Sequence, residues 1–313
     1  MSDALFEGLE ARLFLSNTPT TANPDNEPSS DAGVVAARHE KPAKLDSHTD
    51  TRDIFGKDNR TRVRDTWHHP YAAVGQLDGW WDDGSGLSCT GAVVGRYHVL
   101  TAAHCVYTAK NGTADEVEFT SGLNDGQKPF GTVKSTRVRI DANYPDGESS
   151  ADDYALITLA SPLGDRTGWF GYGAYGTSSF KGMAVRTAGY PGDLSGGDAM
   201  YEQRGKVSYA NTYKIVGKLD VAQGQSGSPV YRKDNTIVGV LSASSSQYTY
   251  ATRITARRFE RIQTWIDKDE TKLAARVTPR ANPIPAASFS TQTIGSGERE
   301  KSSLFQGVED VLS

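Results

Sequence analysis

Short runs of β-branched and aromatic residues, separated by turn-forming residues, fill the middle of the chain. Gly, Asp, Asn or Pro interrupts the pattern about every ten residues, a spacing typical of strands joined by tight connections. The runs include Gly91–Tyr97, Val133–Ile140, Tyr154–Leu159, Ala184–Tyr190 and Thr236–Leu241. With 32 Gly and one convincing long helix, this pattern predicts an all-β, antiparallel sandwich or barrel rather than alternating strands and helices.

The folded core is predicted over residues 53–269. All 5 Trp and all 14 Tyr lie within this range. Residues 16–53 are rich in Pro, Thr, Ser, Asn and Asp, so they cannot bury enough apolar surface to offset the entropy of ordering them. We therefore predict a propeptide or disordered segment at residues 1–52, followed by one domain large enough to bury a sizeable core.

The end of the chain is predicted to be a low-complexity tail over residues 270–313. It follows a closing helix in which Phe259, Ile262 and Ile266 recur at helical spacing. Residues 5–13 and 304–312 share Leu, Phe, Gly and Glu in register. Each is too short to form a stable helix alone, so the pair suggests a duplicated motif that docks on a partner or tethers the tails to the folded domain.

Charge and hydropathy exclude two classes of protein. The chain carries 34 Lys plus Arg against 38 Asp plus Glu and has no basic run, whereas nucleic-acid binding requires clustered cations. Its longest apolar stretches fall far short of the roughly 20 residues that a membrane-spanning helix needs. We predict neither a nucleic-acid partner nor a membrane span.

Three short motifs carry the residue types of acyl transfer. His104 ends the segment Leu100–His104, Asp152 and Asp153 open an apolar strand, and Ser226 lies between two glycines. A Ser hydroxyl needs an imidazole to take its proton and a carboxylate to fix the tautomer of that imidazole. Each motif is weak alone, but their occurrence in the order His, Asp, Ser indicates a hydrolase.

With these motifs the sequence resembles the chymotrypsin-like serine endopeptidases. Thr101–Cys105, Asp153–Leu156 and Gly224–Pro229 stand where that family has its three catalytic motifs. The resemblance covers about residues 53–269 and neither tail. It implies two antiparallel six-stranded barrels with a C-terminal helix, flanked by low-complexity tails, and an enzyme without a cofactor.

Within this family the chain is most similar to the bacterial glutamyl-endopeptidase branch. Asp58-Asn59-Arg60 precedes the first strand, Tyr190-Pro191-Gly192-Asp193 precedes Met200, and the Ser motif ends in Gly227-Ser228-Pro229. These three features carry the likeness to the branch.

The resemblance assigns a role to each residue of the trio. His104 would be the general base, Asp153 the residue that orients it and Ser226 the nucleophile, with the N–H groups of Gly224 and Ser226 as the oxyanion hole. Asp152 is the rival acid. The family places its acid immediately before the apolar strand residues, and strand alternation would turn Asp152 away, which favours Asp153.

Cys89 and Cys105 are the only cysteines. Two buried, reduced thiols would suit a cytosolic protein. The resemblance instead implies a disulfide, which a hairpin between the two positions makes feasible, and hence an oxidising compartment. The disulfide therefore predicts a secreted or extracytoplasmic protein. Residues 1–15 show no secretory signal, so an intracellular protein with reduced cysteines stays open.

Gln225 stands where many zymogens of this family have an Asp that pairs with a freed N-terminal ammonium. A neutral amide cannot make that ion pair, so activation must work differently, as it does in the glutamyl branch. We expect cleavage near Arg52-Asp53 to release residues 1–52 and convert a zymogen into the active enzyme.

The specificity pocket implied by the resemblance departs from the glutamyl pattern. That pattern uses a His after the Ser motif, a nearby Thr and the mature N-terminal amine, and this chain has no His beyond 104. The pocket would instead be lined by Asp220, Val221, Ser242, Ala243 and Ser244. Cleavage after Glu is therefore not expected. Asp220 either selects a cationic side chain or is an ordinary surface or turn Asp.

Metal sites are not predicted. His68-His69 lacks partner ligands at a suitable spacing, and Asp82–Gly86 lacks the alternating ligands and closing Glu of a calcium loop.

Taken together, the three motifs and the resemblance predict a serine endopeptidase acting on protein or peptide substrates. The alternative is a protein of the same fold that works by binding, through its tails.

Overall fold

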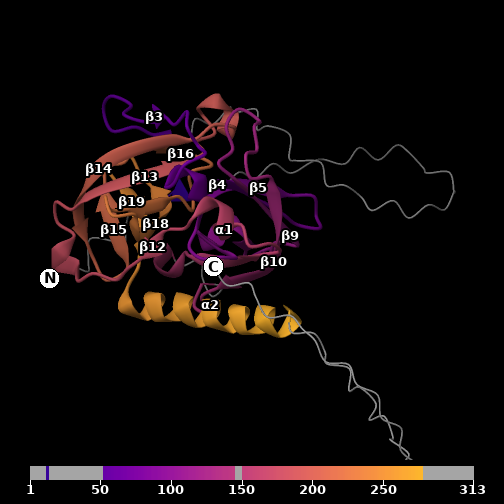
Figure 1. Cartoon of the computed structure of the whole chain (residues 1–313). Helices are drawn as coiled ribbons and strands as arrows, with labels where there is room; N and C mark the ends of the chain where they lie inside the picture. The colour runs from indigo at the N-terminus through magenta and orange to yellow at the C-terminus, as the bar shows by residue number, and fades with distance from the viewer. Residues whose placement is uncertain (1–11, 14–51, 145–149, 278–313) are drawn as a thin grey trace, which may run out of the picture.

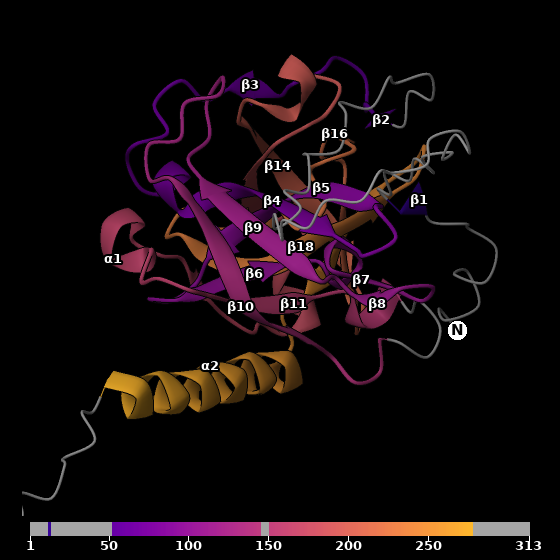
Figure 2. The ribbon, with the colours of Figure 1, turned by 90° about the vertical axis from the view of Figure 1, so that its right-hand side faces the viewer.

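The β-rich runs fold into two antiparallel barrels, each built from six strands (Figures 1 and 2). The computed structural model describes residues 12–13, 52–144 and 150–277. Turn residues separate the apolar runs in the sequence, and each barrel buries the apolar face of its own sheet. The predicted fold, two six-stranded barrels followed by a helix, is confirmed.

The first barrel closes in the strand order β10-β11-β6-β5-β4-β9. The longest pairing joins β4 to β5 and places Leu77 opposite Cys89. The strands are β4 (Val74–Trp80), β5 (Gly86–Val93), β6 (His98–Thr101), β9 (Glu116–Ser121), β10 (Thr132–Ile140) and β11 (Ala155–Leu159).

The second barrel runs in the order β18-β17-β13-β14-β15-β19, and the pairing of β18 with β19 closes it. The strands are β13 (Ala184–Gly189), β14 (Tyr201–Ala210), β15 (Lys214–Gly217), β17 (Pro229–Tyr231), β18 (Thr236–Ser244) and β19 (Thr249–Arg253).

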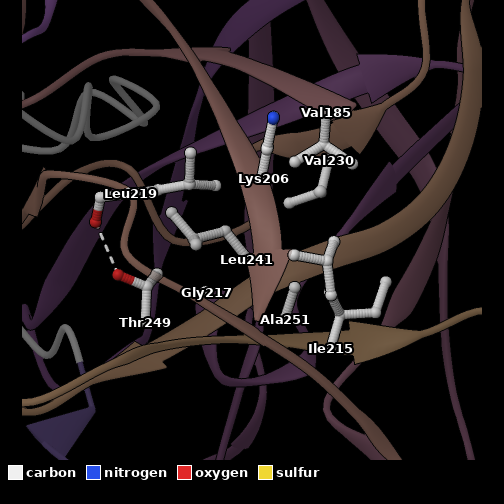
Figure 3. Close-up of a pocket in the computed structure, with 10 residues that line it drawn as sticks. Val185, Lys206, Ile215, Gly217, Leu219, Val230, Leu241, Thr249 and Ala251 are labelled. Carbon is white, nitrogen blue, oxygen red and sulfur yellow. Dashed lines mark hydrogen bonds between the residues drawn. The ribbon is translucent and has the colours of Figure 1, made fainter. Parts of the chain in front are cut away.

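A pocket inside the second barrel is part of its core. Apolar side chains such as Val185, Ile215 and Leu241 line it (Figure 3). The one hydrogen bond drawn there joins the Thr249 hydroxyl to the carbonyl of Leu219, at 2.5 Å. No set of polar groups converges in this part of the described chain, so the pocket offers packing rather than chemistry.

Short elements connect and flank the barrels. The two-residue strands are β1 (Arg12–Leu13), β2 (Arg52–Asp53), β3 (Thr61–Arg62), β7 (Tyr107–Thr108), β8 (Gly112–Thr113), β12 (Gly171–Tyr172) and β16 (Val221–Ala222). The short helical turns are η2 (Tyr71–Ala73), η3 (Ala103–Cys105), η4 (Ser150–Asp152), α1 (Gly164–Thr167), η5 (Thr177–Ser179) and η6 (Ser195–Gly197).

The closing helix α2 (Ala256–Val277) lies along the first barrel (Figure 1). Ile262 and Ile266 are buried in a core that also contains residues of both barrels. Trp265 stacks on Tyr154, with 5.7 Å between ring centroids. The helix ends at Val277, so it continues past residue 269, which the sequence analysis predicts as the end of the domain. None of the helices in the described ranges combines the length and apolarity needed to cross a bilayer.

Candidate active site

A single carboxylate holds both the ring and the backbone of His104. The His104 ring Nδ1 lies 2.8 Å from Asp153 Oδ2, and the His104 backbone N–H donates to Asp153 Oδ1 at 3.0 Å. The turn η3, which follows β6, carries His104, and Asp153 directly precedes Tyr154 and β11. Since both strands belong to the first barrel and pair with each other, that barrel fixes the distance between the two side chains.

The Asp153 carboxylate is held in its charged form. Burial alone would raise the pKa of Asp153, but His104, then Lys214 and Ser242 more than offset it and lower the pKa to about 2. The Ser242 hydroxyl donates to Asp153 Oδ2 at 2.6 Å. A carboxylate that stays ionised and fully hydrogen-bonded can orient an imidazole and stabilise its cationic form.

Asp152 is directed elsewhere. Its Oδ1 accepts from Arg257 Nη2 at 2.6 Å and from Arg258 Nη2 at 3.0 Å. Both arginines belong to α2, so Asp152 ties the closing helix to the first barrel. The structure brings Asp153, and not the rival Asp152, to His104.

The second barrel contributes Ser226, on the turn between β16 and β17. The Thr90 backbone N–H donates to the Ser226 carbonyl at 2.8 Å, which fastens the turn to β5 of the first barrel. Next to it, Gly227 has φ +82°, and a Cβ there would lie 2.1 Å from the Thr90 carbonyl oxygen. Only glycine permits so close an approach of the two backbones.

One side-chain atom of His104 and one of Ser226 are buried and unpaired in the part of the chain that the structure describes. Within the described residues, His104 Nε2 and Ser226 Oγ have no hydrogen-bond partner, although both residues are buried. They are two of eleven such atoms in the described residues, and a catalytic role is one explanation for a buried polar group without a partner. If His104 and Ser226 have the roles that the sequence analysis expects, the proton would pass between these two atoms, and a hydrogen bond between such atoms is often loose before substrate binds.

The turn before Ser226 presents backbone donors. In the part of the chain that the structure describes, the N–H groups of Gly224 and Ser226 make no hydrogen bond. Gly224 has φ +88°, and a Cβ there would lie 2.3 Å from the Tyr190 carbonyl oxygen. The predicted oxyanion donors are therefore available on a turn that requires glycine.

Arg60 supports this turn, a role that the sequence analysis did not find. The Gln225 side-chain oxygen accepts from the Ala222 N–H at 3.0 Å and from Arg60 Nη1 at 3.4 Å. The same guanidinium binds both carboxylate oxygens of Asp193, at 2.8 Å and 2.6 Å. Both residues lie in motifs already singled out, so the available signal was the co-occurrence of those motifs.

The expected disulfide between Cys89 and Cys105 is confirmed. It links β5 to the turn that holds His104. These two sulfurs and the His104 ring form a group of potential metal ligands within 4.8 Å of one another. Disulfide sulfurs are not thiolates, so this donor set does not suit a metal ion.

Asp220 is occupied by the chain itself. Its carboxylate accepts from the backbone N–H groups of Phe55, at 2.7 Å, and Asn59, at 2.9 Å, and from Gln203 Nε2 at 2.7 Å. The residue is buried. It anchors the segment that enters the first barrel, so these contacts do not favour the alternative in which Asp220 selects a cationic substrate.

Asp53 lies against the expected specificity pocket. Strand β2 pairs with β16, which places Asp53 opposite Val221, and the Ser244 hydroxyl donates to the Asp53 carboxylate. Val221 and Ala243 are buried apolar residues, and the Ser242 hydroxyl is directed to Asp153. Nothing local in the sequence connects Asp53 with Ser244, because they lie 191 positions apart.

The backbone of β1 pairs antiparallel with the same edge of β18. Arg12 is opposite Ser244, and Leu13 is opposite Ala243. The rest of the proposed docking motifs, residues 5–11 and 304–312, lies outside the described residues.

Known proteins resemble this chain over the domain that holds the two barrels. The model of the family described as Trypsin matches residues 59–266. The glutamyl endopeptidase of Bacillus licheniformis is 34% identical over 226 residues, which cover 68% of this chain and 69% of that protein. A protein named extracellular metalloprotease, from Bacillus subtilis, is 31% identical over 273 residues, covering 81% of this chain and 87% of that protein.

Solved structures agree with the barrels described above. A Glu endopeptidase in complex with MPD superposes with a TM-score of 0.62 at 27% identity and covers 67% of this chain and 98% of its own. A protease, Anisep, from Arthrobacter nicotinovorans reaches a TM-score of 0.53 at 19% identity, over 62% of this chain and 93% of its own. The second likeness concerns the fold alone.

Proposed function

Because the chain belongs to the trypsin family and is a serine endopeptidase, we propose that Ser226 is its nucleophile, His104 its general base and Asp153 the carboxylate that orients the base. One observation carries this assignment: Asp153 fixes His104 by two hydrogen bonds, at 2.8 Å and 3.0 Å, and leaves His104 Nε2 without a partner among the described residues. That nitrogen is the atom required to accept a proton.

The reaction follows from these positions. Ser226 Oγ attacks the substrate carbonyl carbon while His104 Nε2 takes the hydroxyl proton, and the N–H groups of Gly224 and Ser226 bind the oxygen that becomes negative. Each such donor stabilises the transition state by roughly 3 kcal/mol. The carbon–nitrogen bond then breaks, His104 returns the proton to the leaving amine, and water hydrolyses the Ser226 ester by the same steps.

A fluorophosphonate probe tests the assignment. The probe forms a bond with an activated Ser hydroxyl, so the wild-type protein should be labelled and Ser226→Ala should not. Ser228→Ala is the matched control, because Ser228 is a buried serine in the same turn, and it should still be labelled. Labelling and peptide cleavage that persist in Ser226→Ala would refute the assignment, and partner binding without cleavage in the wild type would favour a binding protein.

The proposal includes poor acceptance of Glu on the N-terminal side of the scissile bond. Support comes from the Asp53 carboxylate beside Ser244 and from the apolar side chain of Val221. A substrate carboxylate there would meet a like charge, which is costly at close range. If cleavage frees the amine of Asp53, the adjacent carboxylate offsets its positive charge. The glutamyl preference in the name of a relative belongs to that relative.

Two peptides that differ only by Glu or Gln at this position test the preference. They are nearly equal in shape, so their ratio of kcat/KM isolates the charge. We expect Gln to exceed Glu at least about tenfold, and Asp53→Asn to reduce the ratio. A preference for Glu that Asp53→Asn leaves unchanged would contradict this part of the proposal.

The proposal also includes removal of residues 1–52 and work outside the cytoplasm. The pairing of β1 with Ser244 and Ala243 supports it, because the N-terminal segment thereby occupies an edge of the expected substrate pocket. The disulfide favours an oxidising compartment. Mass spectrometry of the active species should give a new N-terminus near Asp53, and a full-length active species would contradict removal.

A further inference from the structure

Lys214, the first residue of β15, carries an ammonium group in the protein interior. The residue is 5% exposed. Its Nζ lies 3.0 Å from Ser242 Oγ and 3.1 Å from Thr252 Oγ1. Burying a cation is costly unless it is hydrogen-bonded and faces an opposite charge, and two neutral hydroxyls do not supply that charge.

The opposite charge lies beyond Ser242. The Ser242 hydroxyl, which accepts from Lys214, donates at 2.6 Å to the buried Asp153 carboxylate. The other charges near Lys214 are Asp152 and Arg258, and these two bind each other, with Arg258 Nε 3.2 Å from Asp152 Oδ1. The ammonium and the Asp153 carboxylate therefore form the remaining buried pair, bridged by one hydroxyl.

Donor and acceptor capacity fixes the direction of this bridge. An ammonium has three N–H donors and no acceptor, whereas a Ser hydroxyl has one hydrogen. While Lys214 donates to Ser242 Oγ, the single Ser242 hydrogen is left for Asp153. A side chain without a donor at position 214 would remove this constraint and would leave Asp153 with one fewer cation nearby.

We propose that Lys214 is a positioning residue of the catalytic site: it orients the Ser242 hydroxyl toward Asp153 and supplies the buried positive charge that holds this carboxylate against His104. The inference rests on the proposed roles of Ser226, His104 and Asp153. Lys214 touches none of the reacting atoms and acts through Ser242. Burial lowers the pKa of Lys214 to about 8, while Asp153 opposes that decrease, so the ammonium form is present at neutral pH.

Steady-state kinetics of Lys214→Met test the proposal in the full, activated chain. We expect kcat to fall about 10- to 100-fold, as for loss of a group that holds a catalytic residue, with KM changed less than twofold. Lys206→Met is the matched control, because Lys206 is an exposed lysine on the neighbouring β14, and it should match the wild type. A kcat of Lys214→Met within twofold of the wild type would overturn the proposal.

Two further measurements separate positioning from general support of the fold. The imidazolium form of His104 gains stability when a nearby cation is removed, so the acidic limb of the kcat/KM profile should move to higher pH in Lys214→Met. The downfield proton signal of His104 Nδ1–H, bonded to Asp153, should shift or broaden. A loss of activity with both features unchanged would indicate a structural role and refute the proposal.

A second variant guards against failure to fold. Lys214→Gln keeps a donor for Ser242 but removes the charge, so we expect a smaller fall in kcat and the same shift of the acidic limb. In the Ser242→Ala background, the change to Met should cost less than in the wild type, because the bridge is already gone. Fully additive losses, or an unshifted limb in Lys214→Gln, would overturn the proposal.

Labelling with the fluorophosphonate distinguishes a failure of the Lys214 proposal from a failure of the roles proposed for Ser226, His104 and Asp153. If those roles are wrong, the wild type reacts with fluorophosphonate independently of Ser226, or not at all. If only the Lys214 proposal is wrong, labelling of the wild type still depends on Ser226.

Discussion

Arg60 and Asp193 form a two-pronged ion pair across 133 positions of the chain, with bonds of 2.8 Å and 2.6 Å. The Arg60 side chain is fully buried and that of Asp193 is 14% exposed. Burial alone would lower the pKa of Arg60, but its bonds to Asp58 and Asp193 raise it above the ordinary value. The pair joins the segment before the first barrel to the loop that supports the Ser226 turn.

Arg60→Met should destabilise the protein by about 3 kcal/mol, because it removes the close partner of the mostly buried Asp193 carboxylate and leaves it the half-exposed Arg52, 3.9 Å away. It should also lower kcat about tenfold, since Gln225 beside the oxyanion donors loses a contact. Urea unfolding and steady-state kinetics measure the two effects. Arg62→Met is the control: its partner Asp125 is 58% exposed, so a clearly smaller change in stability is expected. Equal effects would contradict this account.

Asp153→Asn should lower kcat by about 10⁴-fold, because an amide no longer fixes the required tautomer of His104. Asp152→Asn should leave kcat within about threefold and reduce stability, since an amide keeps an acceptor oxygen but loses the negative charge that Arg257 and Arg258 face. Steady-state kinetics and thermal unfolding, measured for both variants, show whether Asp153 or Asp152 is the catalytic acid. The reverse pattern would make Asp152 the catalytic acid.

Gly227→Ala should abolish activity or prevent folding. Its Cβ would lie 2.1 Å from the Thr90 carbonyl oxygen, at a φ of +82° that residues with a side chain rarely adopt. Gly176→Ala is the control, because Gly176 has φ −64° and open space around its Cβ position. That variant should keep wild-type activity and melting temperature. A fully active Gly227→Ala would show that the two barrels tolerate a wider separation at this turn.

Lys214 should make stability depend on pH. Its folded-state pKa of about 8 lies below its ordinary value of 10.5, so between these pH values the unfolded chain binds more protons than the folded one. The contribution of Lys214 to the free energy of unfolding therefore rises with pH across this window, by about 3 kcal/mol, and is least favourable below pH 8.

Urea unfolding from pH 7 to pH 10.5 checks this dependence. The free energy of unfolding of the wild type should increase relative to that of Lys214→Met as the pH rises, and the comparison cancels the titration of tyrosines that both proteins share. A difference that stays constant across the range would mean that Lys214 has an ordinary pKa.

Local patterns were enough to predict the β architecture and to indicate three motifs with the residue types of acyl transfer. Strand alternation and regular turns indicate barrels or sandwiches, because they record which face of each strand is buried. The helix beginning at Ala256 was recognised from Phe259, Ile262 and Ile266. The expected boundary at residue 269 falls inside this helix, which runs to Val277; most of the residues from 270 to 275 are exposed, and only Leu273 among them extends the apolar stripe.

The supporting contacts of the site could not be predicted in this way. The local sequence around Arg60, Lys214 and Asp53 does not indicate which residues they contact, although Arg60 and Asp53 lie in segments that the sequence analysis quoted. Their partners Asp193, Ser242 and Ser244 lie between 28 and 191 positions away, and no short-range pattern records which residues meet across two barrels.

The sequence by itself determined the β architecture, the pairing of the two cysteines once the family was recognised, and the order of His104, Asp153 and Ser226, because residue type and spacing govern strands, turns and reactive groups. Only the tertiary structure decided that Asp153 rather than Asp152 meets His104, that Asp220 is occupied by backbone amides, and that a lysine is buried behind Ser242 and Asp153. These outcomes depend on barrel closure, which sets the distances between strands remote in sequence.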